Sequence, residues 1–140
     1  MGIKRVYGKT GKDELDGKSR YFSDWQLVDE TSEKTVLAVE EEIIGSEASI
    51  YLKGDCRTDT YNYIRQELRA LYTADKSIVI HCDQLNYMAN KVVNVLAETL
   101  QGIENLERGA IELRDVSPEV QKDLASIGLL NMLVIRKSEG

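Results

Sequence analysis

The sequence predicts an α/β fold, in which a mixed sheet of about four to five strands has helices packed mainly on one face. A β-rich run over residues 35–44 is followed by a turn at Gly45-Ser46, and residues 48–53 then alternate between apolar and polar side chains. After this hairpin the chain alternates between helical and strand periodicity, which favours right-handed crossovers and a mainly parallel or mixed sheet. The predicted order is β-β-α-β-α-β-α-β.

The first crossover helix is predicted to begin near residues 58–60, after Gly54 ends the preceding strand. Its apolar side chains recur at helical spacing and form one stripe: Tyr61, Ile64, Leu68 and Leu71. Residues 77–82 are then almost continuously apolar. A short run of this kind is typical of a strand that is buried on both faces.

The second half of the chain repeats this alternation. Asn90 is a predicted N-cap of the next helix, and Gly102 stands where a helix C-terminus favours glycine. Residues 111–114 alternate as a strand, and Ser117-Pro118-Glu119 supplies a capping oxygen, a fixed φ and an acidic side chain to a third helix. Residues 129–135 form the last predicted strand.

The chain divides near residue 35. Residues 1–34 are polar and rich in Gly, Lys and Asp, and residues 8–18 are typical of a loop. We expect this N-terminal extension to be a short strand or covering segment, partly flexible, and residues 35–140 to form the domain. The acidic run Glu40-Glu41-Glu42 is expected at the end of an edge strand, divided between the two faces of the sheet.

Composition narrows the range of functions. The 140 residues fit one domain, and the net charge of −6 disfavours nucleic acid and anionic membranes as partners. Neither a signal peptide nor a membrane-spanning run is apparent, so we expect a cytoplasmic protein without membrane insertion. Cys56 and Cys82 are expected to be reduced and structural. The sequence suggests neither a metal site nor a cofactor.

Catalysis is not expected either. His81 is the only histidine, and strand alternation places it on the face opposite to Cys82, so the two side chains do not form a nucleophile–base pair. We expect a buried structural histidine. Asp55, Asp59 and Asp83 lie near strand ends and helix starts, where capping and turn formation explain them and a site at the sheet rim is the alternative.

Five features of the sequence point to a known family. They are the segment Ile50–Gly54 with its closing glycine, Thr60 at the start of the first predicted helix, the apolar run 78–83, and the late segments Val116–Val120 and Ile127–Leu129. In this order they resemble the second strand, the helix start, the central strand and two late segments of the STAS domain, the fold of bacterial anti-sigma factor antagonists and of the cytoplasmic tails of sulfate transporters.

The resemblance implies a non-catalytic module that binds a protein partner, either a kinase or anti-sigma-like protein or a scaffold protein. Family members are phosphorylated on a serine at the start of the second helix. Here the matching motif is degenerate: Ala89 replaces the acid, Asn90 the phosphorylated serine and Lys91 a second serine. Thr58 and Thr60 are the alternative phosphate acceptors.

The partner-binding surface implied by the resemblance comprises Arg57, Thr58, Thr60, Ala89, Asn90 and Lys91. A STAS-like domain that binds a small ligand, such as a nucleotide or lipid, is the alternative function, and an enzyme is the least favoured one. The oligomeric state stays open, with a homodimer among the alternatives.

Overall fold

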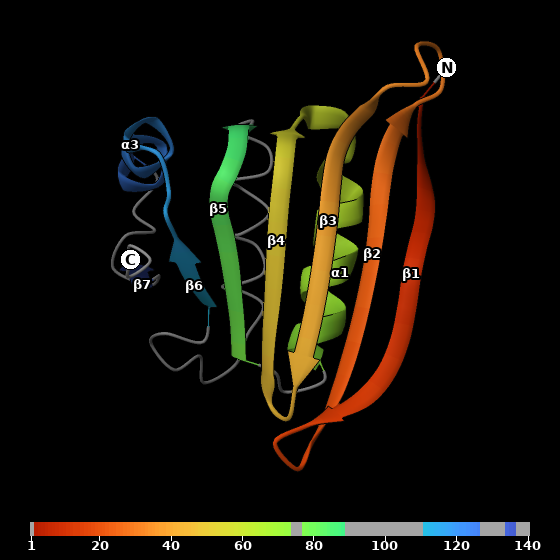
Figure 1. Cartoon of the computed structure of the whole chain (residues 1–140). Helices are drawn as coiled ribbons and strands as arrows, with labels where there is room; N and C mark the ends of the chain where they lie inside the picture. Colours follow the sequence, from red (N-terminus) through yellow and green to blue (C-terminus); the bar gives the residue numbers. More distant parts are fainter. Residues whose placement is uncertain (1, 74–76, 89–110, 127–133, 137–140) are drawn as a thin grey trace.

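The computed structural model describes residues 2–73, 77–88, 111–126 and 134–136. Within these ranges, seven strands rather than the expected four to five form one sheet, ordered in space as they are in sequence (Figure 1). The strands are β1 (Ile3–Leu15), β2 (Lys18–Asp29), β3 (Thr35–Ile44), β4 (Glu47–Cys56), β5 (Ser77–Met88), β6 (Ile111–Arg114) and β7 (Val134–Arg136). The helices are η1 (Thr58–Thr60), α1 (Tyr61–Thr73) and α3 (Pro118–Ser126).

The sheet is mixed, as predicted. Strands β1 to β4 pair antiparallel, and β4 to β7 pair parallel. The predicted hairpin, first helix and later strands are confirmed where the structure describes them. The helix predicted after Asn90 lies outside the described residues. At α3, the Val120 amide donates to Ser117 Oγ at 3.2 Å, so Ser117 is the predicted N-cap.

The N-terminal segment differs from the expected short strand or covering segment. It forms two long strands, β1 and β2, that extend the sheet beyond β3. Trp25 lies opposite Val39 and Leu27 opposite Leu37, so β2 adds its large apolar side chains to the buried face of β3. Ser23, on the same face, interrupts the apolar alternation that predicts a strand.

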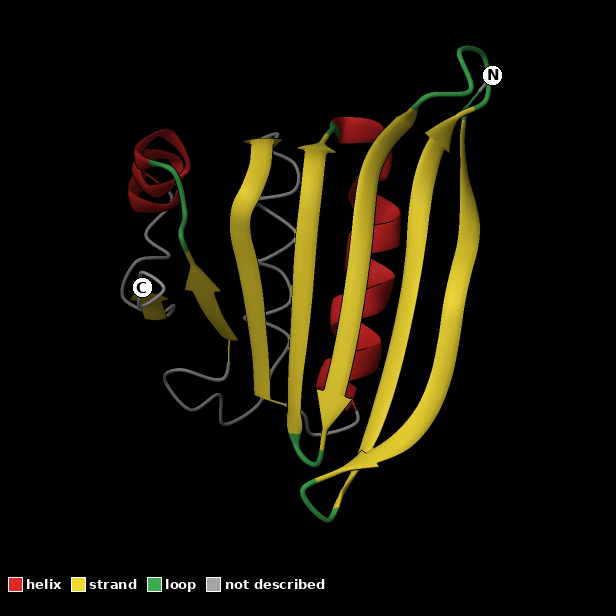
Figure 2. Cartoon of the chain, in the orientation of Figure 1, coloured by secondary structure: helices red, strands yellow, loops and turns green. Residues whose placement is uncertain are grey.

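The hydrophobic core lies between α1 and one face of the sheet, which we call the inner face (Figure 2). Ile64, Leu68 and Leu71 of α1 are buried, which confirms the predicted stripe. No described helix covers the opposite, outer face of β2 to β5 (Figure 2). Among the described residues, none of the helices is long and apolar enough to cross a membrane.

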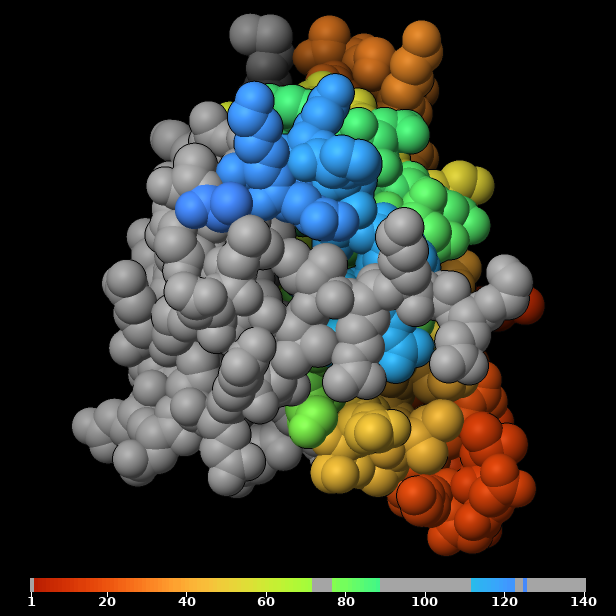
Figure 3. Space-filling model, turned by 90° about the vertical axis from the view of Figure 1, so that its left-hand side faces the viewer, coloured from red at the N-terminus to blue at the C-terminus, as the bar shows by residue number. Residues whose placement is uncertain are grey.

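Strand β4 continues past Gly54, where the sequence predicted its end. Gly54 has a φ of 112°, and a Cβ atom there would lie 2.5 Å from the carbonyl oxygen of Val36. Glycine therefore allows the strand to pass close to β3 and to shift its register with β5. The strand ends at Cys56. Figure 3 views the molecule from the side on which β6 and α3 lie.

Candidate functional site

The predicted partner-binding surface lies where β4 ends and α1 begins. Arg57 follows β4 directly, and its Nε donates to Asp59 Oδ1 at 3.0 Å. Its Nη2 also lies 3.7 Å from Asp29 Oδ2, at the end of β2. We call Asp29 and residues 57–60 the rim. Its ion pairs join the N-terminal hairpin to the start of the helical region.

The two rim threonines differ in accessibility. Thr58 is exposed, whereas Thr60 is fully buried. The Thr60 hydroxyl donates to the Arg57 carbonyl at 2.8 Å, and the Thr60 amide donates to the same oxygen at 3.0 Å. Thr60 therefore closes the turn that opens the helix, and the hydroxyl of Thr58 is the more accessible of the two.

Asp29 anchors its side of the rim. Its Oδ1 accepts hydrogen bonds from the amides of Ser32 at 3.1 Å and Thr31 at 2.9 Å. These two bonds, assisted by Arg57, hold the pKa of Asp29 below its ordinary value. The carboxylate is therefore ionised at neutral pH, and it helps to fix the position of the Arg57 guanidinium.

The other predicted site residues, Ala89, Asn90 and Lys91, lie outside the described residues. Met88 precedes them in the sequence and pairs with Cys56 across the parallel β4–β5 ladder. Cys56 in turn precedes Arg57. The end of β5 is thus brought beside the rim, at the carboxyl edge of the two parallel strands.

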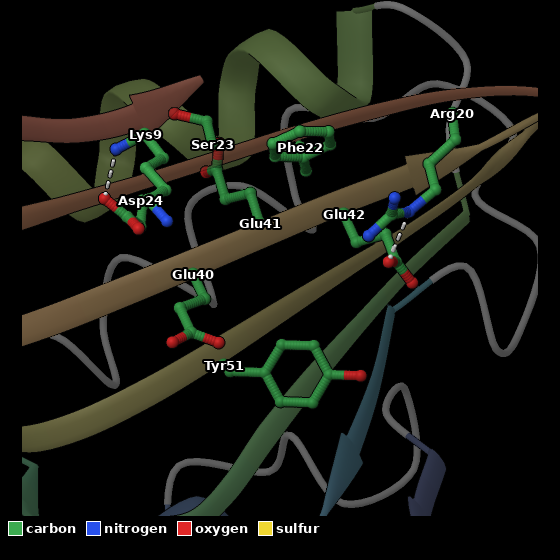
Figure 4. Close-up of a pocket in the computed structure, with 9 residues that line it drawn as sticks. All are labelled: Lys9, Arg20, Phe22, Ser23, Asp24, Glu40, Glu41, Glu42 and Tyr51. Carbon is green, nitrogen blue, oxygen red and sulfur yellow. Dashed lines mark hydrogen bonds and ion pairs between the residues drawn. The ribbon is translucent and has the colours of Figure 1, made fainter. Parts of the chain in front are cut away.

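The outer face of the sheet carries a polar hollow of about 410 Å³ (Figure 4). Arg20 crosses it, pairing through Nε with Glu42 at 2.8 Å and lying 4.8 Å above the centre of the Phe22 ring. Asp24 accepts a hydrogen bond from the Lys9 amide at 2.8 Å. Within this hollow, Arg20 and Glu42 are therefore paired with each other, and Asp24 is held by a backbone amide.

A second hollow of about 390 Å³ adjoins the first and shares Glu40 and Tyr51 with it. Here the expectation of a buried histidine is wrong: His81 is half-buried on the outer face and stacks on Tyr51, with ring centres 4.1 Å apart. Partial burial, with a contribution from Arg114, lowers the pKa of His81. The imidazole is therefore neutral at pH 7.

The acidic run was also expected on an edge strand, and this expectation is wrong because β2 covers that edge of β3. The division between faces is as predicted. Glu40 is exposed on the outer face, while Glu41 points inward and is only 8% exposed. Burial, followed by a hydrogen bond to Glu67 of α1, raises the pKa of Glu41 to about 8.

Arg5 is the cation that faces this buried pair. Its Nη1 lies 3.2 Å from Glu67 Oε1, and its guanidinium lies 4.2 Å from the centre of the Trp25 ring and 5.2 Å from that of Tyr63. We call Arg5, Trp25, Glu41, Tyr63 and Glu67 the Arg5 cluster. It links β1, β2, β3 and α1. The sequence offered no signal for it, because its members lie far apart along the chain.

The two cysteines both lie in the core. Cys56 and Cys82 are free thiols, and burial raises the pKa of each, so both are protonated at neutral pH. Within the described ranges, nowhere do three or more His, Cys, Asp or Glu side chains come together in a way that could hold a metal ion.

Comparison with known proteins identifies the domain. A family model described as the STAS domain matches residues 36–140. No curated protein matches the chain at a significant level. The strands β1 and β2 lie before the matched region.

Solved structures show the same fold. The anti-sigma factor antagonist SpoIIAA in its unphosphorylated form aligns with a TM-score of 0.58 and 19% identity, over 69% of this chain and 86% of that one. An anti-sigma factor antagonist from Mycobacterium paratuberculosis aligns with a TM-score of 0.61 and 13% identity, over 71% and 85%. The phosphorylated form of the Bacillus cell fate determinant SpoIIAA aligns with a TM-score of 0.55 and 18% identity, over 69% and 89%. The family model spans well over half of the sequence, and the chain therefore belongs to the STAS domain family.

Proposed function

We propose that this STAS domain is a non-catalytic regulatory module that binds a protein partner through its rim, in the manner of an anti-sigma factor antagonist. The partner is a kinase or anti-sigma-like protein, or a scaffold protein. The observation that carries this proposal is the exposed Arg57–Thr58–Asp59 segment, held in place at the carboxyl edge of β4.

The geometry of the rim suits protein recognition. Arg57 is 38% exposed in its side chain, yet carboxylates on both sides restrict it. A side chain that is already ordered loses less conformational entropy when a partner binds. Because the rim carries one cation between two acids, we expect partner contacts of both signs, set by charge complementarity.

The regulation proposed for this module differs from phosphorylation at the second helix. Asn90 stands at the position of the phosphorylated serine in the family motif, and its amide provides no hydroxyl to accept phosphate. Modification of Thr58 would instead add about −1.5 to −2 charge beside Arg57 and Asp59. We therefore propose that partner binding is constitutive or is controlled through Thr58.

Affinity capture from source-cell lysate, followed by titration with the purified captured protein, tests the binding surface. We expect Arg57→Glu to weaken binding at least about tenfold, a loss of about 1.4 kcal/mol. Lys18→Glu is the matched control, because Lys18 is an exposed cation at the other end of β2 from Asp29. We expect this control to bind like the parent.

A folded Arg57→Glu variant that binds as tightly as the parent would overturn the proposed surface. Capture of no protein by the parent would instead favour the small-ligand alternative. A thermal-shift screen with nucleotides and lipids then decides, because a ligand at 100 times its Kd adds roughly 2.7 kcal/mol of stability.

The proposed loss of the phosphorylation site at the start of the second helix has its own test. The parent and an Ala89→Asp/Asn90→Ser double variant are each incubated with the captured kinase and ATP, and their intact masses are measured. We expect one added phosphate on the double variant that the parent lacks. A double variant that gains no phosphate would contradict the loss of the serine site, and phosphate on the parent that persists in a Thr58→Ala variant would contradict the role of Thr58.

A further inference from the structure

We infer that β1 is a self-association edge, which pairs antiparallel with β1 of a second copy of this chain. In the described sheet, β1 is the terminal strand and pairs on one side only, with β2. It is 13 residues long. An edge of this length presents a row of unpaired backbone N–H and C=O groups that another strand can satisfy.

The apolar side chains of this edge support the inference. Among the described residues, five large hydrophobic side chains are exposed, and three of them lie on β1. These are Val6, Tyr7 and Leu15, at 45%, 62% and 45% exposure. Pairing with a second strand would bring cross-strand neighbours against side chains that the chain itself leaves in water.

The order of charges along β1 specifies the partner. Lys4 and Arg5 lie near its start, and Asp13 and Glu14 lie near its end. Antiparallel pairing of two identical strands brings the start of each beside the end of the other. Basic residues then face acidic residues at both ends of the pairing, which is the charge complementarity that a second copy provides and an unrelated strand does not.

The bulge in β1 restricts the register. Arg5 and Tyr7 lie opposite buried residues of β2, and so face inward, but the register shifts between Tyr7 and Thr10. After the shift the even-numbered residues face inward: Thr10 opposite Ser23, Lys12 opposite Tyr21 and Glu14 opposite Ser19. An antiparallel two-fold pair keeps both inner faces on one side, so inward residues must meet inward residues.

Two registers satisfy this condition over the longest stretch of strand. One places Arg5 opposite Lys12 of the other copy, and two like charges directly opposite each other are destabilising. The other places Arg5 opposite Glu14 and Tyr7 opposite Lys12, with no like-charge pair. We assign the second register. Lysines and a bulge often protect an edge strand from indiscriminate pairing. Here they leave one favourable register for pairing with a second copy.

Sedimentation velocity across a concentration series tests the association. We expect the parent to form a reversible dimer. Glu14→Lys should raise the dimer Kd about tenfold, because it places a second cation directly opposite Arg5 at both ends, and Lys4→Glu should raise it less, because Lys4 lies opposite Leu15 and only diagonal to Asp13. The double variant Lys4→Glu/Asp13→Lys restores opposite charges at that diagonal, so we expect it to dimerise like the parent. A control reversal at Lys34, in the β2–β3 turn, should have no effect.

Disulfide trapping tests the register. Tyr7→Cys/Lys12→Cys should give a covalent dimer under mild oxidation, because directly opposite residues lie within disulfide range. Val6→Cys/Lys12→Cys should not, since these positions face opposite sides of the sheet. A parent that stays monomeric at every concentration would overturn the inference, as would a dimer that ignores both charge reversals.

Discussion

The two faces of the sheet carry similar residue types in very different surroundings. Trp25 and Glu41 lie on the inner face beneath α1, whereas Phe22 and Glu40 lie close to them in sequence on the outer face. Because no described helix covers the outer face, its aromatic and acidic side chains keep contact with water (Figure 2). Strand alternation assigns each residue to a face, and the position of one helix then decides which face becomes the core.

The largest difference between the faces should appear at their aromatic residues. Trp25→Ala should lower the free energy of unfolding by about 3–5 kcal/mol, because Trp25 is 2% exposed and its removal leaves a cavity. Phe22→Ala, on the outer face, should cost about 1 kcal/mol or less. Urea denaturation of both variants measures the difference. Equal losses would mean that the outer face is covered in solution.

The two arginines provide a second contrast. Arg5→Met should cost about 2 kcal/mol, since it leaves Glu41 and Glu67 without their cation in a largely buried cluster. Arg20→Met should cost less than Arg5→Met, because the ion pairs of Arg20 with Asp13 and Glu42 are more exposed. The same urea titration compares them at pH 7. A larger loss for Arg20→Met would place the main electrostatic link on the outer face.

The two glutamates should differ in pH dependence. Because the pKa of Glu41 is raised to about 8 from an ordinary value near 4.5, the folded state holds a proton that the unfolded state releases. The stabilising contribution of protonated Glu41 to the free energy of unfolding is fully present below about pH 4.5. It is lost as the pH rises to about 8, at no more than about 1.4 kcal/mol per pH unit.

In Glu41→Gln the side chain stays uncharged at every pH, so the variant does not lose stability as the pH rises. We expect its free energy of unfolding to equal that of the parent at pH 4 and to exceed it by about 1–2 kcal/mol at pH 7. Glu40→Gln, on the outer face, should leave the profile of the parent unchanged. Chemical denaturation at intervals from pH 4 to 9 gives both profiles. A parent profile that is flat between pH 5 and 8 would show that Glu41 ionises normally.

The smallest effect is expected at the stacked pair of the outer face. His81→Ala removes the Tyr51–His81 stack and should cost about 0.5–1 kcal/mol. The cost should be the same at pH 7.5 and pH 9, because the pKa of His81 is lowered from its ordinary value of 6.5 and the imidazole is neutral over this range. A strong dependence of this cost on pH would mean that the imidazole is charged when it contacts Tyr51.

Sequence periodicity predicted the parts of the fold whose apolar side chains repeat regularly. The β3–β4 hairpin and α1 bury most of the residues that the pattern selected. Strand β5 was predicted to be buried on both faces, but only Ile78, Ile80 and Cys82 are buried, and Val79 and His81 on the other face are half-buried. Strands β1 and β2 escaped prediction, because β1 is mostly exposed and polar, and Ser23 interrupts the alternation of β2. The wrong edge assignment of the acidic run follows from that omission, since β2 turns β3 into an interior strand.

The binding role of the rim stays a prediction, but the exposure of its residues differs from one to the next. Thr58 is exposed and Arg57 is half-exposed, whereas the turn that opens α1 buries Thr60. His81 and Cys82 lie on opposite faces as predicted, but His81 is half-buried rather than buried, because no described helix covers its face of the sheet (Figure 2). The Arg5 cluster joins residues from four elements, and local sequence patterns carry no information on such distant contacts.

Hydrogen exchange of the chain, alone and bound to its captured protein partner, tests the central claim most directly. The proposed rim predicts slower exchange on binding at the amides of residues 57–61, with unchanged exchange at the outer-face strands around Tyr51 and His81. The Arg57→Glu variant should lose this protection. Protection confined to the outer face, with residues 57–61 unchanged, would contradict the claim that the rim binds the partner.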